Sequence, residues 1–267
     1  MNIDKLTSKE FKEKLDKQII DEKLSEIPVG LIHLLNNSVI NYCLNQKVGA
    51  KKRPTARVLN NWIKELGIVK VDANDKGKIK RFDILESIWI NILVELRDFG
   101  MSIDSIKRTR KILFDYKVRN FTVFKYHVIN SIINESQTLV IFKDGGARIL
   151  STENYIYLLN KGVFLAHLSF KLVDFIKPEY PNHSFFEKFN ITSSFEDIQK
   201  MKLLFFLRTG KYQYIKIKLS EQDIRYIENS KMFLNNVDAI NAVSEWNFVE
   251  ILISIDDDTQ TIITPKI

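Results

Sequence analysis

The sequence predicts an α+β fold, with a helical N-terminal part followed by a strand-rich C-terminal part that contains two repeated β-hairpins. Up to about residue 134, apolar residues recur at helical spacing behind residues that favour N-caps. After residue 136, partly alternating segments and a Gly-Gly turn favour strands. The 45% hydrophobic content and the 18 phenylalanines are enough to build cores, so global disorder is not expected.

Turn signals and changes in the hydrophobic pattern divide the 267 residues into four parts. We expect an N-terminal helical extension at 1–37, a compact helical unit at 38–117, a helix plus β-hairpin region at 118–184 and a small α+β domain at 185–267. This division agrees with the two or three compact units that the length favours.

The first two helices are predicted from caps and spacing. Residues 7–26 predict an amphipathic helix, either packed on the body or solvated, because apolar side chains recur among alternating Lys and Glu residues. A second helix is predicted at 38–48, with Ser38 as its N-cap and Gly49 at its end. The basic run AKKRP follows it.

The stretch RVLNNWIKELGIVKVDANDKGKIKRF, residues 57–82, predicts a helix with two different faces and then a short hairpin with a basic tip. Pro54 or Thr55 opens the helix, and Gly67 is placed to end it. The apolar face, directed to a core, contains Leu59, Trp62, Ile63 and Leu66. The polar face, hereafter the polar stripe, contains Arg57, Asn60, Asn61 and Lys64. The turn of the hairpin is expected at NDKG, 74–77.

Two more helices complete the predicted compact unit. Asp83 caps the first of them, and Ser102 starts the second, which runs through Lys111. The inward positions of the first are expected to be Leu85, Ile88, Trp89, Ile92, Leu93 and Leu96. A further helix is expected at about 121–134.

Strand patterns dominate the remainder of the chain. A hairpin is expected at 138–150, where the Asp-Gly-Gly sequence at 144–146 supplies the positive φ angles of a tight turn. Residues 167–176 alternate partly, and 177–184 predict a loop or linker. Residues 195–208 predict a helix.

The last stretch contains an internal repeat. Residues 212–231 match 246–266 at an offset of 34, or of 35 after one inserted residue. Corresponding pairs include Ile215/Val249, Ile217/Ile251, Leu219/Ile253 and Ile227/Ile262. Two hairpins joined by a helix at about 235–244 predict one antiparallel sheet covered by that helix, a small domain without chemistry of its own.

The formal net charge of +7 is concentrated in one segment. From Lys47 to Arg81 the sequence has eleven Lys or Arg residues and three acidic residues, which gives 11 − 3 = +8, and the other 232 residues sum to −1. A positive field confined to 35 residues indicates a footprint for a polyanion, with chance clustering as the alternative.

The polar stripe has the chemistry of DNA readout. In the major groove, Arg suits guanine and Asn suits adenine in bidentate fashion, whereas lysines neutralise phosphates and fix register. The candidate DNA-binding residues are Lys51, Lys52, Arg53, Arg57, Asn60, Asn61, Lys64, Lys76, Lys78, Lys80 and Arg81.

Three motifs resemble the winged helix-turn-helix of MerR-type transcription regulators. They are VLNNWIKELGIV at 58–69, GKIKRFDILESI at 77–88 and ELRDFGMSIDSIK at 95–107, within a resemblance that covers about 38–116. Asn60 stands where the family usually has Arg. The resemblance implies a winged helix-turn-helix domain and a transcriptional regulator that reads DNA with the helix at 55–66.

Other functions stay open on the sequence alone. An accessory DNA-bending, partition or excision factor of a mobile element would bind DNA in the same way, and a non-catalytic adaptor would offer its basic patch to an acidic partner. A homodimer is expected because symmetric operators commonly require two subunits. The strand-rich part could bind an effector, pair subunits or dock a partner.

The sequence gives no sign of an enzyme, a cofactor or a metal. The four histidines are scattered, Asp256, Asp257 and Asp258 suit a turn, and no Gly-rich phosphate loop is present. Cys43 is the single cysteine, which fits a reducing compartment. No signal peptide or membrane span is expected, so we predict a cytoplasmic protein with no membrane partner.

Overall fold

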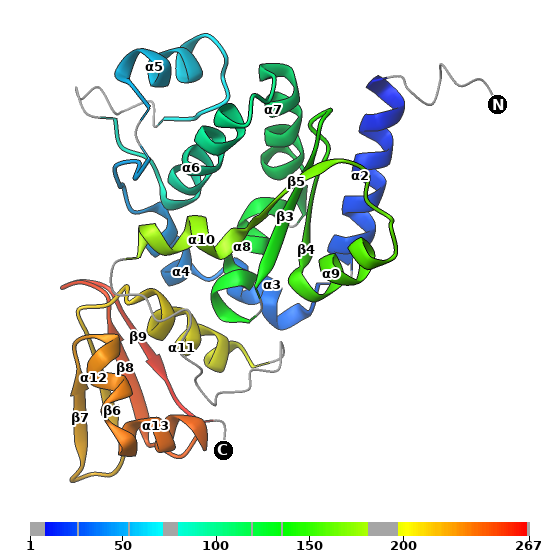
Figure 1. Ribbon diagram of the computed structural model, residues 1–267. Helices are drawn as coiled ribbons and strands as arrows, with labels where there is room; N and C mark the ends of the chain where they lie inside the picture. The colour runs from blue at the N-terminus through cyan, green and yellow to red at the C-terminus, as the bar shows by residue number, and fades with distance from the viewer. Residues whose placement is uncertain are drawn as a thin grey trace.

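The computed structural model confirms the α+β class: helices pack with a three-stranded and a four-stranded antiparallel sheet, and two further short strands pair with each other (Figure 1). The structure describes residues 9–25, 27–52, 54–71, 80–118, 120–134, 136–180 and 197–265. The predicted hairpin turn at 74–77 lies outside the described residues. Among the described residues, no helix has both the length and the apolar character needed to cross a membrane.

The described part of the chain begins with three helices. They are α2 (Lys9–Ser25), α3 (Val29–Leu35) and α4 (Ser38–Asn45). Asn37, and not Ser38 as predicted, caps α4, because its side chain accepts hydrogen bonds from the amides of Val39 and Ile40. Both residue types suit an N-cap, so the sequence could not separate these neighbouring positions.

The next helix of the body, α6 (Ile84–Asp98), is buried on nearly all sides. The predicted caps are confirmed: Asp83 accepts a 2.7 Å hydrogen bond from the Glu86 amide, and Ser102 accepts a 3.1 Å bond from the Ser105 amide. After Ser102 the chain forms α7 (Ile103–Arg110), the π-helical turn Lys111–Asp115, the short strands β1 (Lys117–Val118) and β2 (Phe121–Thr122), and α8 (Val123–Ile133).

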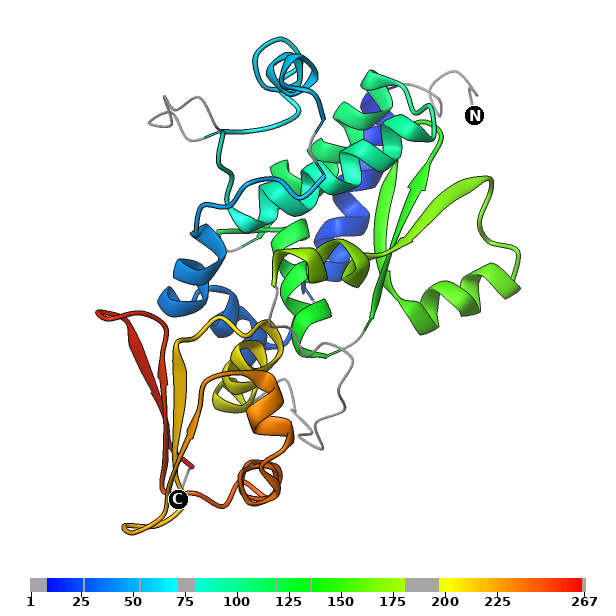
Figure 2. The ribbon, with the colours of Figure 1, turned by 60° about the vertical axis from the view of Figure 1, so that its left-hand side comes forward.

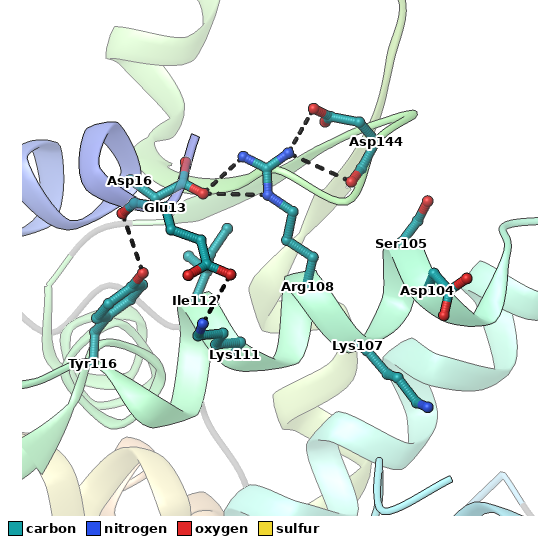
Figure 3. A pocket seen from close by; sticks show the side chains of 10 residues that line it. All are labelled: Glu13, Asp16, Asp104, Ser105, Lys107, Arg108, Lys111, Ile112, Tyr116 and Asp144. Atoms are coloured by element: carbon teal, nitrogen blue, oxygen red, sulfur yellow. Dashed lines mark hydrogen bonds and ion pairs between the residues drawn. The ribbon is translucent and has the colours of Figure 1, made fainter. Parts of the chain in front are cut away.

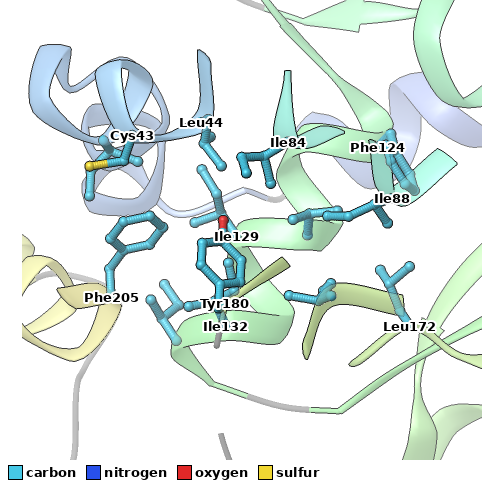
Figure 4. Packing of buried hydrophobic residues seen from close by; sticks show 14 of the residues in the cluster. Cys43, Leu44, Ile84, Ile88, Phe124, Ile129, Ile132, Leu172, Tyr180 and Phe205 are labelled. Carbon is cyan, nitrogen blue, oxygen red and sulfur yellow. The ribbon is translucent and has the colours of Figure 1, made fainter. Parts of the chain in front are cut away.

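One continuous core joins these helices to the C-terminal part (Figure 4). Cys43 and Ile88 pack there with Phe124, Tyr180 and Phe205. Burial raises the pKa of the Cys43 thiol to about 12, so the thiol stays protonated. Since this core continues across residues 117 and 184, packing alone does not divide the chain there, and the four-part division stays a prediction.

The predicted hairpin at 138–150 is confirmed as part of a three-stranded sheet. It contains β3 (Gln137–Phe142) and β4 (Ala147–Ser151), and the strand order is β4-β3-β5 with β5 at His167–Lys171. Gly145 has φ +85°, and a Cβ there would lie 2.1 Å from the Ser105 carbonyl oxygen. Glycine is therefore required both by the turn and by its contact with α7.

Helices follow two of these strands. They are α9 (Thr152–Asn160) and α10 (Leu172–Ile176), the latter continued by the 3₁₀ turn Lys177–Glu179. The segment 167–176 is thus a strand only in its first half.

The C-terminal part is a four-stranded antiparallel sheet of order β7-β6-β8-β9, as the repeat predicted. Its elements are α11 (Ile198–Thr209), β6 (Tyr214–Lys218), β7 (Ile224–Ile227), α12 (Ser230–Leu234), α13 (Val237–Ser244), β8 (Glu250–Ser254) and β9 (Gln260–Ile263). The helices α11, α12 and α13 lie on one side of this sheet (Figure 2).

The predicted offset of the repeat is wrong. In the first hairpin Ile215 pairs with Ile227, and in the second Ile251 pairs with Ile263. Ile215 therefore corresponds to Ile251 and Ile227 to Ile263, an offset of 36 residues. A shift of two residues leaves the alternation of a strand unchanged, so an offset of 34 looked equally good in β6 and β8. The offset of 35 matched Ile262, which is exposed, with Ile227 of the first hairpin, which is buried.

Candidate nucleic-acid interface

The basic segment, residues 47–81, extends from the rest of the protein, and two paired residues lie at its ends. The amide of each of Val48 and Phe82 donates a 2.8 Å hydrogen bond to the carbonyl of the other. The segment of charge +8, Lys47 to Arg81, falls almost entirely between these two positions. Its helix, α5 (Ala56–Lys64), lies at the margin of the molecule in both views (Figures 1 and 2). The cations are therefore concentrated on one protruding part of the fold.

The predicted helix and its apolar face are confirmed in α5. The Thr55 hydroxyl accepts a 3.4 Å hydrogen bond from the Val58 amide at the N-cap, and Gly67 has φ +63° beyond the C-terminus. Trp62 is buried, and Leu59 and Ile63 pack partly against the core. This packing directs the opposite face of α5 outward.

All four residues of the polar stripe are exposed. Within the described part of the chain, their side chains make no recorded hydrogen bond or ion pair with other residues. Their donors and acceptors are therefore accessible to a ligand, and all four side chains carry donors, with no acidic residue in the stripe.

The flanking cations differ in their surroundings. Lys51 and Arg81 are exposed, and Lys80 is half-buried. Lys52 forms an ion pair with Glu95, so its charge is partly neutralised within the chain. Arg53, Lys76 and Lys78 lie outside the described residues.

Two basic residues absent from the predicted set belong to the same surface. Lys47 and Lys70 line a small hollow of about 210 Å³ beside Phe82 and Asp83. Both lie within the basic segment, and the cluster of charge in the sequence was the signal that could have included them.

Three hydrogen bonds from α6 hold the two ends of α5. Before α5, the Lys52 amide donates to Asn91 Oδ1 at 3.0 Å. After it, Trp89 Nε1 donates to the Ile68 carbonyl at 2.7 Å, and the Lys70 amide donates to Glu86 Oε1 at 2.6 Å. Because both ends of α5 are fixed to one buried helix, the orientation of the polar stripe is set by the body of the protein.

A buried ion pair supports the second of these ends. Arg110 Nη2 lies 3.0 Å from Glu86 Oε2, and the two side chains are 7% and 6% exposed. The guanidinium of Arg110 also lies 4.4 Å from the centre of the Phe114 ring. Burial raises the pKa of Glu86, and the charge of Arg110 and its hydrogen bond act against that shift.

A second buried carboxyl supports the first end. Glu179 Oε1 accepts hydrogen bonds from Ser87 Oγ at 2.9 Å and from Asn91 Nδ2 at 3.1 Å. Since Asn91 in turn holds the Lys52 amide, Glu179 orients the side chain that fixes the approach to α5. Burial raises the pKa of Glu179.

Glu179→Gln should stabilise the protein relative to wild type by an amount that grows as the pH rises. The folded-state pKa of Glu179 lies above its ordinary 4.5, so the contribution of this carboxyl to the stability of the folded protein is fully present below pH 4.5. Its contribution is lost as the pH rises through the folded-state pKa, whereas Gln does not titrate and keeps an acceptor. Urea unfolding of both proteins across this pH range measures the difference between their free energies of unfolding. A difference that narrows with rising pH would contradict a raised pKa of Glu179 in the folded protein.

A charged pocket of about 600 Å³ lies between α2 and α7 (Figure 3). Arg108 reaches Asp16 at 2.7 Å and Asp144 at 2.5 Å, and Lys111 reaches Glu13 at 3.0 Å. These charges are paired with one another, so the cluster anchors α2 and the β3–β4 turn to the body.

Sequence reasoning missed the residues that position α5. Glu86, Asn91 and Arg110 lie on predicted helices, but Asn91 and Glu179 are 88 residues apart. The available signal was the presence of polar residues inside the apolar run ILESIWINIL, 84–93, of which Glu86, Ser87 and Asn91 are buried. Buried polar groups require partners, and the sequence does not name them.

The winged helix-turn-helix arrangement stays a prediction. The expected wing includes residues 72–79, which lie outside the described range, and α4 lies apart from α5 in both views (Figures 1 and 2). In the described part of the chain, no group of three or more His, Cys, Asp or Glu residues could hold a metal ion. No family model matches the chain, and no curated protein or solved structure matches it significantly.

Proposed function

We propose that the chain binds double-stranded DNA in a sequence-specific manner, with α5 in the major groove. The observation that carries the proposal is the exposed polar stripe of Arg57, Asn60, Asn61 and Lys64, on a helix whose other face is packed. Arg and Asn form bidentate hydrogen bonds with guanine and adenine, and each good pair discriminates by ~1–3 kcal/mol.

The surrounding cations support the same proposal. Lys51 and Arg81 are exposed and lie within three residues of the paired Val48 and Phe82, at the base of the segment that contains α5, and exposed cations there are suited to contact phosphates. Anchoring of both ends of α5 to α6 supplies the fixed geometry that base readout requires.

The resemblance to MerR-type regulators favours transcriptional regulation as the role of this binding. An accessory DNA-bending, partition or excision factor of a mobile element remains the second role for the same interface. Genome-wide binding sites separate the two, because a regulator occupies promoters and an accessory factor occupies the ends of an element.

Asn60→Ala and Asn61→Ala should erode discrimination between DNA sequences, by ~1–3 kcal/mol at the contacted base pair. Lys80→Ala should instead weaken binding to all sequences about equally. The measurement selects bound sequences from a random DNA pool and then compares affinities for the selected site and for unrelated DNA.

Asn241→Ala, on the exposed face of α13, is the matched control and should alter neither quantity. If the Asn60, Asn61 and Lys80 variants behaved alike, base readout by α5 would be rejected. If the chain bound no duplex but bound an acidic protein, the adaptor function would replace DNA binding.

A further inference from the structure

The helix α9 exposes an unusual amount of apolar surface. It has no buried residue, and three of its residues, Thr152, Tyr155 and Leu158, are half-buried. Five large apolar side chains within ten residues are exposed, with Tyr157 at 60% and Leu165 at 83%; the others are Ile156, Leu159 and Val163. We call these five residues the α9 patch. Exposed apolar side chains gathered within so few residues mark an interaction site more often than a free surface.

The orientation of α9 is fixed by an aromatic cluster on its inner side. Tyr155 Oη lies 3.1 Å from His167 Nε2, and the Tyr155 ring stacks on Phe164 with the centroids 5.8 Å apart. His167 Nδ1 also lies 2.7 Å from the Leu165 carbonyl oxygen, which fixes the segment after α9. Because the inner face is occupied in this way, the α9 patch cannot turn inward without breaking these contacts.

The charges beside the α9 patch are self-complementary. Glu153 and Lys161 are both exposed, and each lies four residues from Tyr157. In an antiparallel pair of α9 helices that crosses at Tyr157, Glu153 of one copy lies opposite the partner's Lys161, and the reverse pair forms by symmetry. A two-fold interface requires this kind of self-matching.

We propose that the α9 patch is the interface through which two copies of this chain form a symmetric dimer. The apolar side chains would supply the buried centre, and the two Glu153–Lys161 pairs would set the antiparallel orientation. The helix α9 lies apart from α5 in both views (Figures 1 and 2), so this dimer would leave the polar stripe of each copy accessible. The inference does not depend on DNA binding.

A membrane surface fits the patch less well. Helices that lie on anionic bilayers carry several Lys or Arg residues on their polar face. Residues 152–166 have one acidic and one basic residue, so they have no net charge for such a surface.

Sedimentation equilibrium of the full chain, across a series of concentrations and without DNA, tests the proposal. The wild type should be a dimer, and Ile156→Glu and Tyr157→Glu should each raise its dissociation constant by about tenfold or more. Val237→Glu, at an equally exposed apolar position on α13, is the matched control and should leave the dimer intact. A monomeric wild type at every concentration would overturn the proposal.

Charge reversal tests the orientation. Glu153→Lys alone and Lys161→Glu alone should each weaken the dimer by about tenfold, because like charges then face each other. The double variant Glu153→Lys/Lys161→Glu should restore it. Circular dichroism of every variant shows whether the fold is retained. A double variant as weak as the singles, with the fold retained, would reject the antiparallel α9 pairing.

Discussion

The affinity of the chain for duplex DNA should fall by about 10³–10⁵-fold when the salt concentration rises from about 50 to about 200 mM. Each phosphate that a Lys or Arg neutralises releases a condensed counterion, and this range corresponds to ~6–10 phosphate contacts. The described basic residues that would supply the phosphate contacts are Lys47, Lys51, Lys64, Lys70, Lys80 and Arg81. Fluorescence anisotropy with a labelled duplex, at several salt concentrations, gives the slope of log affinity against log salt.

Single variants test which cations carry this effect. Lys51→Ala and Arg81→Ala should each reduce the salt slope by about 1 and weaken binding to all sequences. Lys231→Ala, on the exposed surface of α12, is the matched control and should keep the wild-type slope. A wild-type affinity that does not change with salt would reject an interface built on the basic segment.

Arg110→Ala should lower the free energy of unfolding by ~3–5 kcal/mol. The substitution leaves the Glu86 carboxylate buried with the Lys70 amide as its remaining recorded hydrogen-bond donor. It also removes the guanidinium from the Phe114 ring, 4.4 Å away. Denaturant unfolding measures the loss, which makes this the largest stability effect that we expect of a single charged residue here.

A second pair of variants separates charge from packing. Arg110→Met keeps most of the volume but leaves Glu86 uncompensated, whereas Glu86→Gln/Arg110→Met removes the charge and keeps an acceptor for the Lys70 amide. The double variant should therefore be more stable than Arg110→Met alone. If Arg110→Ala cost less than ~1 kcal/mol, the ion pair would not support the exit from α5.

Local elements could be predicted from the sequence where the signal is short-range. The caps at Asp83 and Ser102 were found, and Thr55 was one of the two residues expected to open α5, because a side chain meets an amide three residues away. The Gly67 terminus and the β3–β4 turn were found because a positive φ angle favours glycine. These features are confirmed in the structure.

The wrong predictions concern places where two alternative cap positions, or two alternative alignments of the repeat, have almost the same local energy. Asn37 and Ser38 both suit the cap of α4, and an offset of 34 or 36 gives the repeated strands the same alternation. Pairing between strands decides the offset, and this pairing depends on residues far apart in the chain.

The sequence by itself determined that Arg57, Asn60, Asn61 and Lys64 share one helical face, because helix pitch alone brings residues three and four apart together. Only the tertiary structure decided that this face is exposed and how α5 is held. The hydrogen bonds that Lys52 donates to Asn91 and that Asn91 donates to Glu179 join residues 39 and 88 positions apart. Such contacts form only when α6 is buried in the core, since burial is what makes each polar group require a partner.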